Sequence, residues 1–238
     1  MNQRVRGFPA FPKGKRRSRF ARTWWGNAWL QAMEDIALDP DQLRHGRRYA
    51  FGGHVGPIAV SPGRIAATVQ DEVGEHRTEL SIAELADAGW DRFLDRLSAR
   101  SGHIAALLEG EMPADLVDSA ADAGVRLLPG MGDLEPDCDC PGFEHPCRHA
   151  AALGYQASWL LDADPFVLLL MRGRGRPELL AQLRAGAARS EPDELARSAA
   201  AAAARARDLL AGWPGADAVL DPFLGTVSGG SRRLVQRE

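Results

Sequence analysis

The sequence predicts an α+β protein in which helices surround a small antiparallel sheet and a metal-bound hairpin leads into a helix. Three observations predict this fold class. Short β-branched or alternating runs, separated by turn sequences, lie between residues 49 and 82. Apolar residues on both sides of that region recur at helical spacing. Three cysteines and a histidine cluster between residues 138 and 149.

The first predicted helix covers residues 24–37. Trp25 and Trp29 are four residues apart and therefore share one face of that helix, where they are more typical of a core than of a ligand site. Asp39-Pro40-Asp41 ends the helix, and a short helical turn through Arg44 follows.

Three runs predict the strands of a small antiparallel meander. They cover residues 58–60, 65–69 and 78–82. Turn sequences at residues 61–63 and 72–75 separate them.

Helical spacing dominates the rest of the chain, apart from a short strand or extended segment at residues 125–128. A final long helix is expected from Ser190 to Ala211, because Ser190 and Asp193 resemble a capping box and Gly212 follows. The other predicted helices cover residues 82–97, 104–108, 113–123, 150–161, 165–171 and 178–183.

We expect four regions along the 238 residues. They are a basic flexible arm over 1–22, an α+β region over 23–130, a zinc finger with its following helices over 131–186, and an alanine-rich helix with a flexible tail over 187–238.

Charge is distributed unevenly between the first 22 residues and the rest. The first segment holds eight of the 29 basic residues and no acid, which leaves 21 basic against 32 acidic residues in the remainder. A basic arm on an acidic body is typical of nucleic-acid contact, although such an arm could equally fold back onto its own body.

Several functional classes find no support in the sequence. No apolar run approaches the roughly 20 residues that cross a bilayer, and no apolar segment follows the basic N-terminus as in a secretory signal. We therefore expect a cytoplasmic protein without membrane contact. A nucleotide-binding Gly-Lys loop, a serine elbow and a metal-binding set of acids are all absent, so we expect neither an enzyme nor a small-molecule substrate.

The cysteine cluster has the spacing of a zinc site. Cys138 and Cys140 form one pair, Cys147 and His149 form another, and Pro141-Gly142 supplies a turn between them. An odd, clustered set of cysteines does not describe a disulfide framework, whereas three thiolates and one imidazole match the ligands that zinc prefers. His145 could replace His149, but it stands between Glu144 and Pro146 in an expected loop. We therefore favour His149.

Four protein ligands predict a structural rather than a catalytic zinc. A catalytic zinc keeps one coordination position open for water or substrate, and this set leaves none. We expect one structural Zn²⁺, which contributes directly to folding.

The C-x-C, six-residue gap and C-x-H pattern resembles the SWIM zinc finger. Over roughly residues 20–185 the chain is similar to bacterial SWIM zinc finger family proteins, which are often associated with SNF2-type helicases. Residues 23–29, 44–49, 164–166 and 172–174 add to the likeness. The resemblance implies zinc binding, a DNA-binding or protein-interaction role, and no catalytic activity.

Basic and aromatic residues predict the partner. Lys and Arg neutralise phosphates, and aromatic side chains such as those of Phe8, Phe11 and Phe20 can stack on bases. We expect nucleic acid, with DNA favoured, and a SNF2-type helicase as a protein partner; the alternative is a helicase scaffold without direct nucleic-acid contact. The predicted nucleic-acid contacts are Lys13, Lys15, Arg16, Arg17, Arg19, Arg22, Arg148, Arg172, Arg174 and Arg176.

Overall fold

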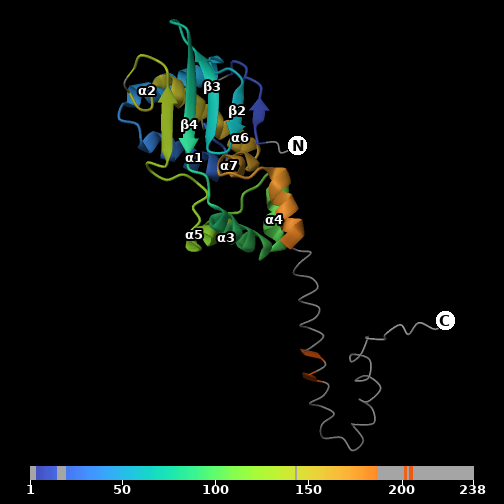
Figure 1. Cartoon of the computed structure of the whole chain (residues 1–238). Coiled ribbons are helices and arrows are strands. Elements are labelled where there is room, and N and C mark those ends of the chain that lie inside the picture. Colours follow the sequence, from blue (N-terminus) through green and yellow to red (C-terminus); the bar gives the residue numbers. More distant parts are fainter. Residues whose placement is uncertain (1–3, 15–19, 143, 187–200, 203, 206–238) are drawn as a thin grey trace, which may run out of the picture. The chain divides into compact units, whose positions relative to one another are not determined.

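The computed structural model describes residues 4–14, 20–142, 144–186, 201–202 and 204–205 (Figure 1). The chain divides into two compact units, Met1–Leu183 and Arg184–Glu238. All labelled strands and helices belong to the first unit. Residues 201–202 and 204–205 of the predicted alanine-rich helix are helical, and the rest of that prediction lies outside the described residues.

A five-stranded antiparallel sheet forms the centre of the first unit, with the strands in the order β1-β2-β3-β4-β5. Alternate residues of β4 are buried and exposed, as expected for a sheet that is covered on one face. The strands are β1 (Arg6–Phe8), β2 (Ile58–Ser61), β3 (Arg64–Gln70), β4 (Glu75–Ile82) and β5 (Leu134–Cys138).

The helices cover one face of the sheet and one end of it (Figure 1). α6 packs against both β3 and β4, while α1 and α2 pack against α6. The helices are α1 (Trp24–Asp35), α2 (Pro40–Gly52), α3 (Asp87–Ser98), α4 (Ser101–Leu108), α5 (Ala114–Asp122), α6 (Arg148–Ala163) and α7 (Phe166–Met171). Residues 176–186 are also helical.

Small residues allow α6 to lie at the centre of the core, where nearly all of it is buried. A Cβ added at Gly46 of α2 would lie 2.5 Å from the Cβ of Ala151, and one added at Gly154 would clash with the Met33 side chain of α1. The indole of Trp29 donates to the Gly154 carbonyl at 3.0 Å. These contacts hold the start of α6, and therefore the predicted metal site, against two other helices.

A second apolar cluster joins α3, α4, α5 and α7. None of the helices in the described part of the chain is long and apolar enough to span a bilayer. The largest fully buried side chains of this cluster are Trp90, Phe93, Phe166, Leu97, Leu107 and Leu116.

The α+β fold class and the strands β2, β3 and β4 are confirmed, but several boundaries differ from the prediction. α2 continues to Gly52 rather than ending near Arg44, because its Gly46 and Ala50 pack against α6. Ile82 is the last residue of β4, so α3 begins only at Asp87. Residues 125–128 form no strand, and two further strands, β1 and β5, were not predicted.

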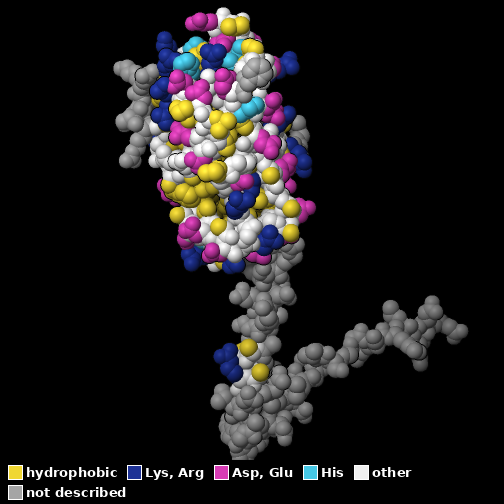
Figure 2. All heavy atoms as spheres, turned by 90° about the vertical axis from the view of Figure 1, so that its left-hand side faces the viewer, with side chains coloured by type: hydrophobic (Ala, Val, Ile, Leu, Met, Phe, Trp, Pro, Cys, Tyr) yellow, Lys and Arg dark blue, Asp and Glu magenta, His cyan; other side chains and the backbone are white. Residues whose placement is uncertain are grey.

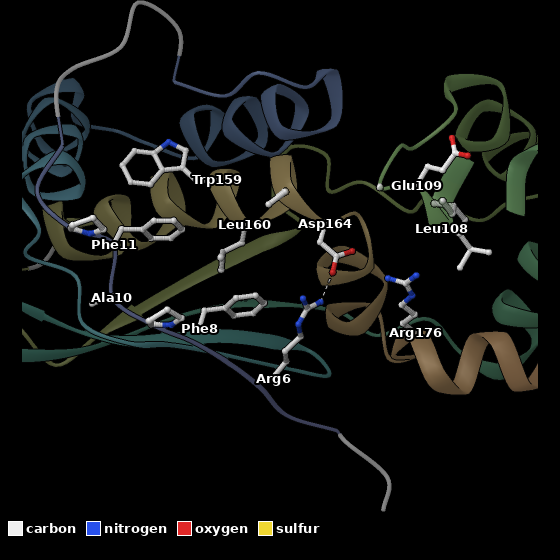
Figure 3. A pocket seen from close by; sticks show the side chains of 15 residues that line it. Arg6, Phe8, Ala10, Phe11, Leu108, Glu109, Trp159, Leu160, Asp164 and Arg176 are labelled. Carbon is white, nitrogen blue, oxygen red and sulfur yellow. Dashed lines mark hydrogen bonds and ion pairs between the residues drawn. The ribbon is translucent and has the colours of Figure 1, made fainter. Parts of the chain in front are cut away.

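The expectation of a flexible arm is wrong for the described part of residues 1–22. Arg6–Phe8 form β1, and the Arg6 guanidinium donates to Asp164 at 2.5 Å. Phe11 packs edge-on against Trp159, with the ring centroids 5.1 Å apart. The segment also walls a cavity of about 530 Å³ between α4, α6 and Arg176 (Figure 3). Its aromatic residues thus bind it to the body, while residues 15–19 lie outside the described residues.

Candidate metal centre

The four predicted ligands meet at one point. The three cysteine Sγ atoms and a ring nitrogen of His149 all lie within 4.8 Å of one another. Nδ1 of His149 is 3.8 Å from Cys138 Sγ and 3.9 Å from Cys147 Sγ. Zinc bonds of about 2.3 Å to sulfur and about 2.0 Å to nitrogen separate tetrahedral ligand atoms by roughly 3.5–4 Å. The donor set and its spacing therefore fit one Zn²⁺.

Secondary structure places each pair of ligands. Cys138 is the last residue of β5 and pairs with Thr78 of β4, whose hydroxyl lies 3.3 Å from Cys138 Sγ. Cys147 is the N-cap of α6, where its Sγ accepts the Ala150 N–H at 3.5 Å. His149 lies in the first turn of that helix. Zinc would thus join the end of a strand to the start of a helix.

The structure decides between the two candidate histidines. His149 is only 1% exposed and belongs to the cluster. His145 is exposed in the loop before α6 and is not part of the group. The preference for His149 is confirmed.

The thiols are close enough to alter one another's protonation. The Cys147 thiol donates toward Cys138 and lowers the pKa of Cys138 to about 3. The same contact, followed by burial, raises the pKa of Cys147, while burial raises that of Cys140. A bound cation deprotonates coordinating thiols, which is what a three-thiolate zinc site requires.

A buried carboxylate orients the histidine ligand. Nε2 of His149 lies 3.1 Å from Asp71 Oδ2, on the side of the ring opposite the thiols. Burial alone would raise the pKa of Asp71, but hydrogen bonds from the Val73 and Gly74 N–H groups and from His149 outweigh it and hold this pKa far below its usual value. An ionised Asp71 accepts a hydrogen bond from Nε2–H of His149. The proton therefore stays on Nε2, and the lone pair of Nδ1 is left for the metal.

Two aromatic rings enclose the same histidine. His76 stacks on His149 with the ring centroids 4.4 Å apart, and its Nε2 lies 3.3 Å from Asp71 Oδ1. The ring of Tyr49 of α2 is tilted against the His149 ring, with the two centroids 5.9 Å apart. The sequence analysis missed Asp71, His76 and Tyr49. The only signal was the turn sequence around Asp71, because Asp71 and His76 reach the cysteines through the pairing of β3, β4 and β5, and Tyr49 reaches His149 through the packing of α2 on α6.

Comparison with known proteins agrees with this geometry. Residues 123–156 match the family model of the SWIM zinc finger. The chain contains a SWIM zinc finger. The uncharacterized protein Rv2102 of Mycobacterium tuberculosis is 37% identical to it over 174 residues, which is 72% of this chain and 62% of that protein. The chain thus spans less than two thirds of that relative's length. No solved structure matches the chain.

The SWIM finger has the chemistry of a structural site. Its three thiolates and one imidazole complete a tetrahedral set, so zinc supplies a cross-link between β5 and α6. SWIM zinc fingers are nucleic-acid or protein-interaction modules.

Four of the predicted nucleic-acid contacts are exposed: Lys13, Arg22, Arg148 and Arg176. Arg22 lies 3.9 Å from the Asp162 carboxylate, and Arg176 lies over the Phe166 ring at 5.0 Å. Four others, Lys15, Arg16, Arg17 and Arg19, lie outside the described residues.

The prediction is wrong for Arg172 and Arg174, which are buried. The Arg172 guanidinium donates to the Ala83 and Arg126 carbonyls, both at 2.5 Å. That of Arg174 donates to Gln182 and Asp87 and lies over the Trp90 ring. The glycine-spaced arginines thus join the segment after α7 to residues around the second apolar cluster through hydrogen bonds within the protein, while the buried Nε of Arg172 has no partner among the described residues.

Proposed function

We propose that this chain binds nucleic acid, with DNA favoured over RNA, through a surface that its SWIM finger holds in place. The observation that carries the proposal is the position of Arg148. It directly follows the ligand Cys147, and its side chain is exposed. Its backbone N–H donates to Gln42 Oε1 of α2 at 3.1 Å. Among the described residues, no carboxylate lies within ion-pair distance of its guanidinium.

A metal-fixed cation without an acidic partner suits phosphate contact. Zinc removes conformational freedom from the start of α6, so Arg148 needs little further ordering when a phosphate binds. The exposed cations Lys13, Arg22 and Arg176 add sequence-independent attraction.

We further propose that the chain acts in the cytoplasm with a SNF2-type helicase and has no catalytic activity of its own. The support for the helicase is the family resemblance, and the support against catalysis is the filled coordination sphere. The helicase would then perform the ATP-driven step, and this chain would supply contact with the nucleic acid.

The test is fluorescence anisotropy of the full chain with labelled single- and double-stranded DNA and RNA of about 20 nucleotides, titrated from roughly 50 to 200 mM salt. Phosphate contacts should weaken binding steeply over this range, with a linear dependence of log affinity on log salt. If all four nucleic acids fail to bind zinc-loaded protein at the lowest salt, the proposal is contradicted.

The second candidate is a protein-interaction scaffold for a helicase. Acidic and basic side chains are interspersed over much of the face shown in Figure 2, and such mixed charge suits a protein partner. A pull-down from native cells, with and without nuclease, separates the two functions. A helicase that stays bound after nuclease treatment supports the scaffold, whereas one that is released supports bridging by nucleic acid.

A further inference from the structure

A group of cations lies where α2 meets the start of α6. Arg44 and Arg48 are four residues apart on α2, so they share one face and are separated by about 6 Å along the helix axis. Both are exposed, as is Arg148 in the first turn of α6. His45 lies between them and is partly buried. None of the α2 residues was predicted as a nucleic-acid contact.

Close packing of the two helices brings these residues together. Gly46 of α2 touches Ala151 of α6 so closely that no side chain would fit there. One turn earlier on each helix, Gln42 accepts the Arg148 N–H at 3.1 Å. The N-terminal halves of α2 and α6 are therefore held in register, with their exposed arginines on adjoining surfaces.

His45 lies near all three of these arginines. Burial lowers the pKa of His45, and the charges of Arg48, Arg148 and Arg44 lower it further. These cations therefore act on one point from two helices. Figure 2 looks onto the side of the molecule where α2 lies and shows Lys and Arg side chains along the upper margin, close to histidines.

Little negative charge opposes this group. Asp41 pairs with Arg44. The charge of Asp39 raises the pKa of His45, whereas the charges of the arginines lower it. Arg48 and Arg148 have no ion-pair partner among the described residues. Arg47 differs, because it turns toward Glu34 at 2.8 Å and lies over the Tyr155 ring.

We infer that Arg44, Arg48 and Arg148, with His45 beside them, form a surface that binds the phosphate backbone of nucleic acid. This α2–α6 basic surface rests on the proposed function and locates it next to the SWIM finger. Arg48 and Arg148 have no carboxylate partner among the described residues, so they can neutralise phosphates and release counterions, whereas Arg44 would exchange its pairing with Asp41 for a phosphate. The surface contacts the backbone, so it favours no base sequence.

The test compares two double charge reversals in the full, zinc-loaded chain. R48E/R148E alters the basic surface. R92E/R96E changes the net charge equally at exposed arginines of α3 that have no ion-pair partner among the described residues. Zinc content and melting temperature are measured for both variants, and R48Q/R148Q replaces the first one if it fails to fold. The probes are the labelled DNA and RNA described above, with poly-glutamate as a competitor of like charge.

R48E/R148E should weaken binding about tenfold or more and reduce the slope of log affinity against log salt by about 2. R92E/R96E should have a much smaller effect. If the unaltered chain binds and the two variants lose affinity equally, the assigned surface is wrong while nucleic-acid binding stands. If poly-glutamate displaces DNA at equal charge concentration, the surface is a site for acidic protein. If the unaltered chain binds no nucleic acid, both proposals fail.

Discussion

The SWIM finger and the helices α3, α4 and α5 are two parts of one compact unit with different sources of stability. The finger is held by three thiols, an imidazole and the buried carboxylate of Asp71. The three helices pack around large apolar side chains such as Trp90 and Phe93. Near them, the Arg172 guanidinium donates hydrogen bonds to two backbone carbonyls. Among the described residues, the groups that could hold a metal ion lie at the finger, namely the four zinc ligands and the set Asp71, His76 and His149, and none lies at these helices.

The two parts should therefore lose stability for different reasons. A metal site loses its stability when a ligand is removed, because the remaining ligands bind zinc poorly. An apolar cluster loses stability when a cavity is created, whatever the state of the metal. Substitutions in one part should therefore leave the characteristic measurement of the other part unchanged.

Cys140→Ser should have the largest effect. It removes one of four ligands from a site type whose zinc binding is worth about 10–16 kcal/mol in small fingers. Stoichiometric zinc should be lost, and hydrogen exchange should increase over residues 138–161. Metal analysis and exchange mass spectrometry measure both. His145→Ala is the matched control and should retain zinc; an unchanged zinc content in Cys140→Ser would refute the assigned site.

Phe93→Ala should cost about 3–5 kcal/mol in the free energy of unfolding, because it leaves a cavity in the second apolar cluster. Denaturant titration measures this loss. The folded variant should keep one zinc per chain with unchanged affinity. Asp91→Ala, at an exposed position of the same helix, is the control. Weakened zinc affinity in folded Phe93→Ala would show that the two parts are coupled after all.

Arg172→Ala should destabilise the chain by about 2–3 kcal/mol, since it leaves the Ala83 and Arg126 carbonyls without their donor. Arg176→Ala removes an exposed arginine four residues further on, at the start of the next helix, and should change stability by no more than about 0.5 kcal/mol. Unfolding curves of the two variants make the comparison. Equal, small effects would mean that Arg172 is free for an external partner.

Asp71→Ala should weaken zinc binding about 10- to 100-fold, equivalent to about 1.4–2.7 kcal/mol. The three thiols and His149 remain, but the imidazole loses the acceptor that orients it. Competition with a chromophoric chelator measures the affinity, and the absorption of the Co²⁺-substituted protein reports the ligand set. Asp71→Asn should restore part of the affinity through its carbonyl oxygen, and Glu72→Ala should have no effect. Unaltered zinc affinity in Asp71→Ala would remove Asp71 from the site.

Features that depend on neighbouring residues were predictable from the sequence. The four zinc ligands lie within twelve consecutive residues, so their spacing and the Pro141-Gly142 turn define the site locally. The strands β2, β3 and β4 follow one another through short turns, and their alternation marks them directly. The helix after Cys147 was predicted for the same reason.

Features that depend on distant parts of the chain were decided only by the tertiary structure. β5 carries Pro136 and two acids, a poor strand sequence, and forms because β4 offers an open edge. Arg172 and Arg174 look like exposed cations in sequence, and only their pairing with carbonyls and Asp87 distinguishes them from Arg148. Asp71 reaches His149 across 78 positions. The sequence by itself determined the metal, because zinc chemistry needs only four nearby donors. Tertiary packing decided which charges face the solvent and which support the metal, because burial and hydrogen-bond pairing depend on segments that are far apart along the chain.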